Sequence, residues 1–129
     1  MTAPSTPQRV RVDDTTVDER EDVTYQGVPF TGVVYDTADD GTLITEKSYR
    51  DGREDGPQRE WYDDGSPESE YEAAEGTVVG LALDWHPNGQ LARRQRFDRF
   101  GQLRHREVWD DQGTARPDQA FDWPEGAGE

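Results

Sequence analysis

The sequence contains no cysteine, few apolar residues and few positive charges. The absence of cysteine excludes disulfides, thiolate metal ligands and a cysteine nucleophile. Hydrophobic residues make up 30% of the 129 residues, which is low for a globular domain, yet the aromatic residues recur at regular places, unlike those of a disordered chain. One domain fits this length, and we expect a thin core filled by aromatic side chains from a single sheet.

Long apolar runs are also missing. No stretch approaches the length of a membrane span, and the N-terminal stretch MTAPSTPQRVRVDD has no apolar run of secretory length. We therefore expect no signal peptide, no membrane association and a cytoplasmic location. The formal net charge of −15 repels nucleic acid and anionic lipid, and it favours a basic protein partner.

A 24-residue period organises what is present. It relates the turn glycines Gly41, Gly65, Gly89 and Gly113. Nine residues upstream stand Gly32, Gly56, Gly80 and, in the fourth unit, Arg104. Four residues before the last three turn glycines stand Trp61, Trp85 and Trp109. An aromatic residue and then a glycine close each unit: Tyr49, Tyr71, Phe97 and Phe121, with Gly52, Gly76, Gly101 and Gly126.

Each period predicts a β-hairpin, because Asp-Gly and Asn-Gly are strong turn signals between short strands. In LALDW, alternation places Leu81, Leu83 and Trp85 on one face. In LARRQRF, Leu91 and Phe97 share a face with Arg93 and Gln95. We predict an all-β fold in which tandem antiparallel hairpins form one extended, twisted sheet.

The repeat sheet is expected over residues 23–123. Its opening segment VTYQGVPFTGVVY predicts a hairpin that turns near Gly27. Residues 1–22 are expected to form an N-terminal tail in which RVRV (9–12) supplies an edge strand, and residues 124–129 a loose C-terminal tail.

The segments GPQREWYDDGSPESEYEAAEG and GLALDWHPNGQLARRQRF resemble the MORN repeat in its bacterial variant form. The opening VPFTGVVYDTADDGTLITEKSYRDGREDG is similar to the first units of the YwqK-like antitoxins. This resemblance implies a hairpin-repeat sheet and an immunity partner of a secreted polymorphic toxin. Pro67 replaces the leucine after the second turn and Arg104 replaces a glycine, which makes the second and fourth units less regular.

No catalytic, cofactor or metal site is predicted, and we do not expect an enzyme. The Asp-Asp-Gly stretches resemble calcium loops, but hairpin turns require the same residues. Glu68, Glu70 and Glu72 alternate on one strand face, where hydrated carboxylates are expected rather than an acid–base pair. His86 takes the place of Tyr62 beside the repeat tryptophan, and His105 lies in a polar strand, so neither histidine suggests catalysis.

Charge is unevenly distributed. Residues 36–75 hold fourteen acids and four bases, whereas residues 93–106 hold six arginines and one acid. Either the charges pair across strands, or the acidic half forms a binding surface that covers a basic cleft. The residues expected to contact a partner are Asp39, Asp40, Glu54, Asp55, Trp61, Tyr62, Asp63, Asp64, Glu68, Glu70, Tyr71 and Glu72.

The favoured function is a binding protein: an antitoxin that neutralises a basic cognate toxin, of the nuclease or deaminase class, by occlusion. The alternative is a structural MORN-repeat scaffold or a membrane-associated interaction module. An enzyme ranks last, because the sequence has no nucleophile-plus-base arrangement, phosphate loop or metal-ligand spacing.

Overall fold

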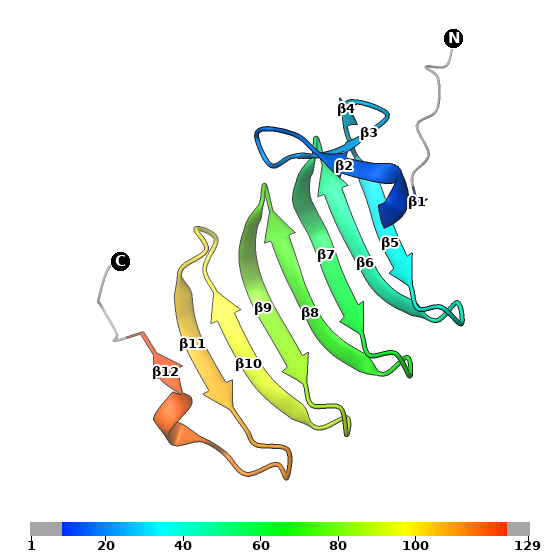
Figure 1. The fold of residues 1–129 in the computed structure, drawn as a ribbon. Helices are drawn as coiled ribbons and strands as arrows, with labels where there is room; N and C mark the ends of the chain where they lie inside the picture. The colour runs from blue at the N-terminus through cyan, green and yellow to red at the C-terminus, as the bar shows by residue number, and fades with distance from the viewer. Residues whose placement is uncertain (1–8, 124–129) are drawn as a thin grey trace.

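The structure, a computed structural model, describes residues 9–123, so residues 1–8 of the predicted N-terminal tail and the whole predicted C-terminal tail, residues 124–129, lie outside the described residues. The fold is almost entirely β, as predicted (Figure 1). Its strands are β1 (Arg9–Arg11), β2 (Thr15–Val17), β3 (Val23–Tyr25), β4 (Val28–Pro29), β5 (Gly32–Thr37), β6 (Leu43–Arg50), β7 (Arg53–Trp61), β8 (Pro67–Ala74), β9 (Thr77–Trp85), β10 (Leu91–Phe97), β11 (Leu103–Val108) and β12 (Phe121–Asp122). Two 3₁₀ turns, η1 (Val12–Asp14) and η2 (Pro117–Gln119), complete it. No helix among the described residues is long and apolar enough to cross a bilayer.

Nine strands form one open sheet in the order β1-β5-β6-β7-β8-β9-β10-β11-β12. From β5 onward the strands lie side by side in chain order, and each pairs antiparallel with the next (Figure 1). The predicted edge strand is present as β1, but it pairs parallel with β5. The sheet is therefore mixed at this edge.

A second sheet of three strands, β2-β3-β4, precedes the hairpins and was not predicted. The hairpin expected near Gly27 is its β3–β4 turn, in which Gln26 and Gly27 both have positive φ. The small sheet is joined to the large one through the β6–β7 turn. Val23 N–H donates to Gly52 C=O at 2.8 Å, and Gly52 N–H donates to Phe30 C=O at 2.9 Å.

The predicted turns are present, and they are of two kinds. The turns at residues 38–42, 62–66, 86–90, 98–102 and 110–114 each contain a glycine with positive φ, whose N–H donates to the residue three before it. The turns at Gly52 and Gly76 have only two residues, and the residue before each glycine, Asp51 or Glu75, also has positive φ. Two-residue turns of this handedness match the twist of the strands that they connect.

The upstream glycines of the period coincide with irregular pairing inside strands. Gly56 and Gly80 have φ of 101° and 68°, and the register shifts beside them. Arg104, their counterpart in the fourth unit, lies at the register shift between β10 and β11. A bulge leaves an unpaired residue and bends the strand, which a glycine tolerates well.

The core differs from the expectation of aromatics buried along a single sheet. Val10, Phe30 and Val34 are buried together, and Val23, Tyr25 and Tyr49 pack against them. These residues come from both sheets, and the cluster lies where the small sheet covers the first strands of the large one. The repeat tryptophans are only partly buried, since a single open sheet gives them no second layer.

Alternation and register define the two faces of the large sheet. The Tyr71 face carries Gln58, Tyr71, Ala82 and Gln95 in one cross-strand row. The Leu83 face carries Arg59, Glu70, Leu83, Arg94 and Glu107. The core cluster lies on the Tyr71 side, because Val34 is in register with Lys47, which pairs with Gln58.

Candidate binding surfaces

The turn rim is the edge of the sheet formed by the five-residue turns 38–42, 62–66, 86–90 and 110–114, which follow one another along the lower edge in Figure 1. In the first two turns, Asp40 and Asp64 accept a backbone N–H from the residue two ahead, Thr42 or Ser66, at 2.9 Å. Hydrogen bonds from the backbone and hydroxyl of Thr42 lower the pKa of Asp40, and those from the hydroxyl and backbone of Ser66 lower the pKa of Asp64. Both carboxylates are therefore charged at neutral pH.

Successive units are joined next to this rim by equivalent hydrogen bonds. The Tyr62 hydroxyl donates to Trp85 C=O at 2.6 Å, and His86 Nε2, 24 positions on, is 2.9 Å from Trp109 C=O. A carbonyl can only accept, so Nε2 carries the proton in this contact. His86 therefore has the linking role that Tyr62 has one unit earlier, which agrees with the expectation that it is a repeat substitution.

The Tyr71 face carries a hydrogen-bonded network at β6 to β8. The Tyr71 hydroxyl donates to Glu54 Oε1 at 2.8 Å, and Lys47 Nζ lies 3.3 Å from Glu60 Oε1 and 3.9 Å from Glu54 Oε2. Burial, and then the hydrogen bond to the Glu54 carboxylate, raises the pKa of Tyr71 far above its ordinary value. Tyr71 is thus a neutral donor that holds Glu54 in place.

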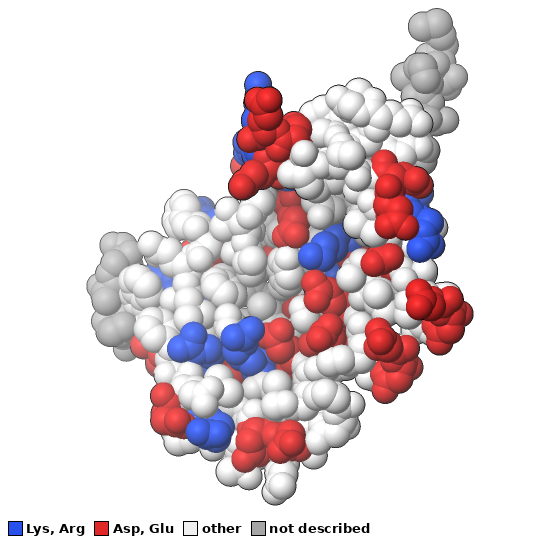
Figure 2. Space-filling view, in the orientation of Figure 1, with Lys and Arg blue, Asp and Glu red and all other residues white. Residues whose placement is uncertain are grey.

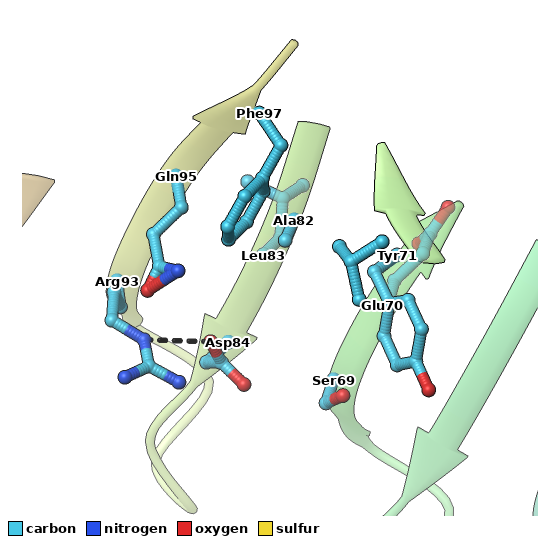
Figure 3. Close-up of a pocket in the computed structure, with 10 residues that line it drawn as sticks. Ser69, Glu70, Tyr71, Ala82, Leu83, Asp84, Arg93, Gln95 and Phe97 are labelled. Atoms are coloured by element: carbon cyan, nitrogen blue, oxygen red, sulfur yellow. Dashed lines mark hydrogen bonds and ion pairs between the residues drawn. The ribbon is translucent and has the colours of Figure 1, made fainter. Parts of the chain in front are cut away.

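Next to this network the Tyr71 face is hollowed (Figure 3). The hollow measures about 210 Å³. Tyr71 from β8 and Phe97 from β10 stand on either side of β9, and Val78 and Ala82 also line it. Its polar end holds the ion pair of Arg93 Nε and Asp84 Oδ2, 3.0 Å apart, with Ser69 and Gln95 nearby.

A second and larger hollow, about 400 Å³, lies between the small sheet and the two-residue turns of the large one. It is lined mainly by charged groups from both sheets: Arg20, Glu21, Asp22, Arg53, Glu54 and Glu75. Arg53 Nε lies 3.7 Å from Asp22 Oδ1, so part of this charge is paired within the chain. Tyr49 also lines it, and burial raises the pKa of Tyr49, as does the Glu54 charge.

The predicted partner-binding residues do not form one patch. Asp39, Asp40, Tyr62, Asp63 and Asp64 lie on the turn rim. Glu54 and Tyr71 meet on the Tyr71 face, while Glu70 and Glu72, in register with Leu83 and Val79, lie on the opposite one. Trp61 and Glu68 lie at the register shift where β7 meets β8, and Asp55 pairs with Arg50 at 3.5 Å.

The two charged halves of the sequence differ in how far they are neutralised. In Figure 2, acidic side chains gather along the lower right side of the molecule, over the ends of β5 to β8, and basic side chains lie over β10 and β11. Three of the six arginines of residues 93–106 form ion pairs: Arg93 with Asp84, Arg94 with Glu107 and Arg104 with Asp98. Within residues 9–123, Asp39 and Asp63 have no ion pair. All four bases of residues 36–75, which are Lys47, Arg50, Arg53 and Arg59, also form ion pairs. Charges therefore pair in both halves, and the acidic half keeps an excess of acids without an ion pair among residues 9–123.

The chain matches no protein-family model, no curated protein and no solved structure. Its own geometry offers four surfaces: the turn rim, the hollowed Tyr71 face, the charged hollow between the two sheets and the Leu83 face. Within residues 9–123, no group of three or more His, Asp or Glu residues is placed to hold a metal ion.

Of the residues that line the hollow of the Tyr71 face, only Glu70 and Tyr71 were predicted from the sequence as candidate site residues. Asp84 and Arg93 stand at one of its ends, and their pairing follows from their places in adjacent strands. Hairpin register could have indicated this contact, because opposite charges directly across a ladder attract each other. Counting residues outward from the β9–β10 turn does not give this register, because a bulge lies between Leu91 and Arg93.

Proposed function

We propose that this protein is a MORN-variant antitoxin or immunity protein that binds a basic cognate toxin of the nuclease or deaminase class. It neutralises the toxin by covering the basic surface with which the toxin holds its phosphate-bearing substrate. The observation that carries this proposal is the acidic turn rim, in which Asp39 and Asp63 are exposed and have no ion pair within residues 9–123.

The geometry of the rim supports the recognition of a basic groove. Successive five-residue turns are two strands apart, or about 10 Å. The first, second and fourth turns carry carboxylates, whereas the third, residues 86–90, carries none, so the negative charges lie along one edge at spacings of one or two such intervals. An enzyme that holds phosphates with Lys and Arg would be attracted to such a row, and the net charge of −15 would accelerate their encounter.

Co-expression with the adjacent gene tests the proposal. We expect the neighbouring gene product to be toxic alone, to be tolerated when this protein is co-expressed, and to elute with it as one complex at low ionic strength. Affinity should fall as salt rises, because the contact is mainly electrostatic. A toxic neighbour that neither co-elutes nor is neutralised would overturn the proposal.

A matched pair of variants tests the surface. Asp39→Asn with Asp63→Asn removes two charges from the rim, and Asp13→Asn with Asp14→Asn removes two exposed charges from η1. Both variants have the same net charge, so a difference reports position alone. We expect the rim variant to bind the toxin at least tenfold more weakly and the η1 variant to bind like the wild type.

A further inference from the structure

The Leu83 face carries a row of charges that reverses sign about its centre. Across β7 to β11 the row runs Arg59, Glu70, Leu83, Arg94 and Glu107, each in direct register with the next. Its order is basic, acidic, apolar, basic, acidic. If two copies of this row face each other in opposite order, every acid lies opposite a base and Leu83 lies opposite Leu83.

The neighbouring positions on the same face continue this order. Glu72 lies two residues beyond Glu70 on β8, and Arg96 lies two residues beyond Arg94 on β10, opposite Leu81. Leu81 is 50% exposed and is one of the large apolar side chains that the fold leaves uncovered. Glu72 and Arg96 are both exposed, and within residues 9–123 neither forms an ion pair or a side-chain hydrogen bond. The face thus has an apolar centre between an acidic and a basic flank.

We propose that this face, centred on Leu81 and Leu83, docks on the same face of a second copy of the chain. A two-fold axis parallel to β9 exchanges the β8 and β10 sides, so Glu70 and Glu72 of each copy lie over Arg94 and Arg96 of the other. A two-fold axis across the strands would instead place acids over acids. The charge order therefore selects one dimer, isologous and with the two β9 strands aligned, an arrangement that packed sheets commonly adopt.

The net charge of −15 on each copy opposes this contact, and ionic strength decides how strongly. The Debye length is about 8 Å at 0.15 M salt, so repulsion between distant charges is largely screened while opposed side chains in contact still attract. The docking patch covers only the central strands and is smaller than a standard stable interface. We expect a weak dimer, with a dissociation constant on the order of 10–100 µM.

Charge reversal at Glu72 and Arg96 tests the dimer by sedimentation equilibrium at 0.15 M salt. Glu72→Arg alone places the introduced guanidinium against Arg96 of the second copy twice per dimer, and Arg96→Glu alone opposes two pairs of acids. We expect each variant to dimerise at least tenfold more weakly than the wild type. An equimolar mixture of the two should associate again, because in the mixed dimer every opposed pair is acid against base.

Controls separate this interface from a general charge effect. Glu19→Arg and Arg99→Glu make the same changes of charge away from the patch, and we expect both to dimerise like the wild type. Recovery in the mixture shows that both reversed chains are folded. A wild type that stays monomeric up to about 1 mM, a dimer that neither reversal weakens, or a mixture that does not associate would each overturn the proposal. The measurement uses no toxin, so its outcome is independent of the proposed antitoxin activity.

Discussion

Phe30 is the largest apolar side chain that the described part of the fold buries completely, at 1% exposure. Its ring lies 5.8 Å from that of Tyr25 and packs with Val10 and Val34 between the two sheets. Phe30→Ala would leave a cavity there, and we expect it to lower the free energy of unfolding by about 3–5 kcal/mol in urea denaturation.

Trp85→Ala provides the comparison, because Trp85 is only partly buried. We expect its loss to lower the free energy of unfolding by less than that of Phe30, but by more than the loss of a single exposed acid, which changes stability by roughly 0.5 kcal/mol or less. A larger effect at Trp85 than at Phe30 would show that the main core lies along the hairpins.

His105 gives the structure a pH-dependent contact at its last strand. Hydrogen bonds to Asp122 and then to Glu107, each 3.1 Å away, raise the pKa of His105 above the ordinary 6.5. They do so even though Arg96, a positively charged residue, is paired with His105 in the β10–β11 ladder. A raised folded-state pKa means that this contribution to stability is fully present below about pH 6.5 and is lost as pH rises through the folded pKa.

NMR titration of the two histidines checks this prediction. We expect His105 to titrate above pH 6.5 in the wild type and closer to its ordinary value in Asp122→Asn. His105→Gln should remove the part of the fall in stability between pH 6 and pH 8 that this residue causes. An unchanged His105 titration in Asp122→Asn would contradict the assignment.

At the scale of elements, the β6–β7 turn joins the two sheets, and Gly52 is the residue at the junction. It is buried with φ of 86°, and a Cβ there would stand 2.7 Å from the Asp22 Cβ and 3.0 Å from Val23 C=O. Gly27 has nearly the same φ, 82°, but nothing lies within 4 Å of a Cβ. The two glycines thus share backbone strain and differ in steric contact.

We predict that Gly27→Ala lowers the free energy of unfolding by about 1–2 kcal/mol, from backbone strain alone. Gly52→Ala should cost at least about 1 kcal/mol more, because the small sheet must move away from the turn. Urea denaturation of both variants measures the difference. Equal losses would mean that the two sheets are not held together at this turn.

The same elements show what the sequence could predict. The hairpins from β5 onward could be predicted, because Gly41, Gly65 and Gly89 follow Asp or Asn in local turn signals that need no tertiary contact. Of the small sheet, only the β3–β4 hairpin near Gly27 could be predicted. Its separation from the large sheet could not, since its strands have two or three residues and no period. The placement of the acids depended on register: alternation correctly placed Glu70 and Glu72 together, but the bulges that fix their relation to Glu54 leave no pattern in the sequence.

At the scale of the whole molecule, stability should fall along the sheet from its first hairpin to its last. Each strand of the large sheet is hydrogen-bonded only to its neighbours in that sheet, so the sheet behaves as a nearly one-dimensional array. The buried cluster of Val10, Phe30 and Val34 lies at the N-terminal end, and β12, the last strand, forms just two register pairs with β11. Local opening should therefore require least free energy at β11 and β12.

Hydrogen–deuterium exchange at low protein concentration measures this gradient. We expect the slowest exchange in β5 to β7 and the fastest in β11 and β12, with β8 to β10 between them. Phe30→Ala should accelerate exchange mainly in β5 and β6 and leave the difference between β10 and β12 unchanged, because the perturbed contacts lie several strands away. Equal acceleration in every strand would show instead that the sheet opens as one cooperative unit, in which case the core at one end stabilises the other end as strongly as its own.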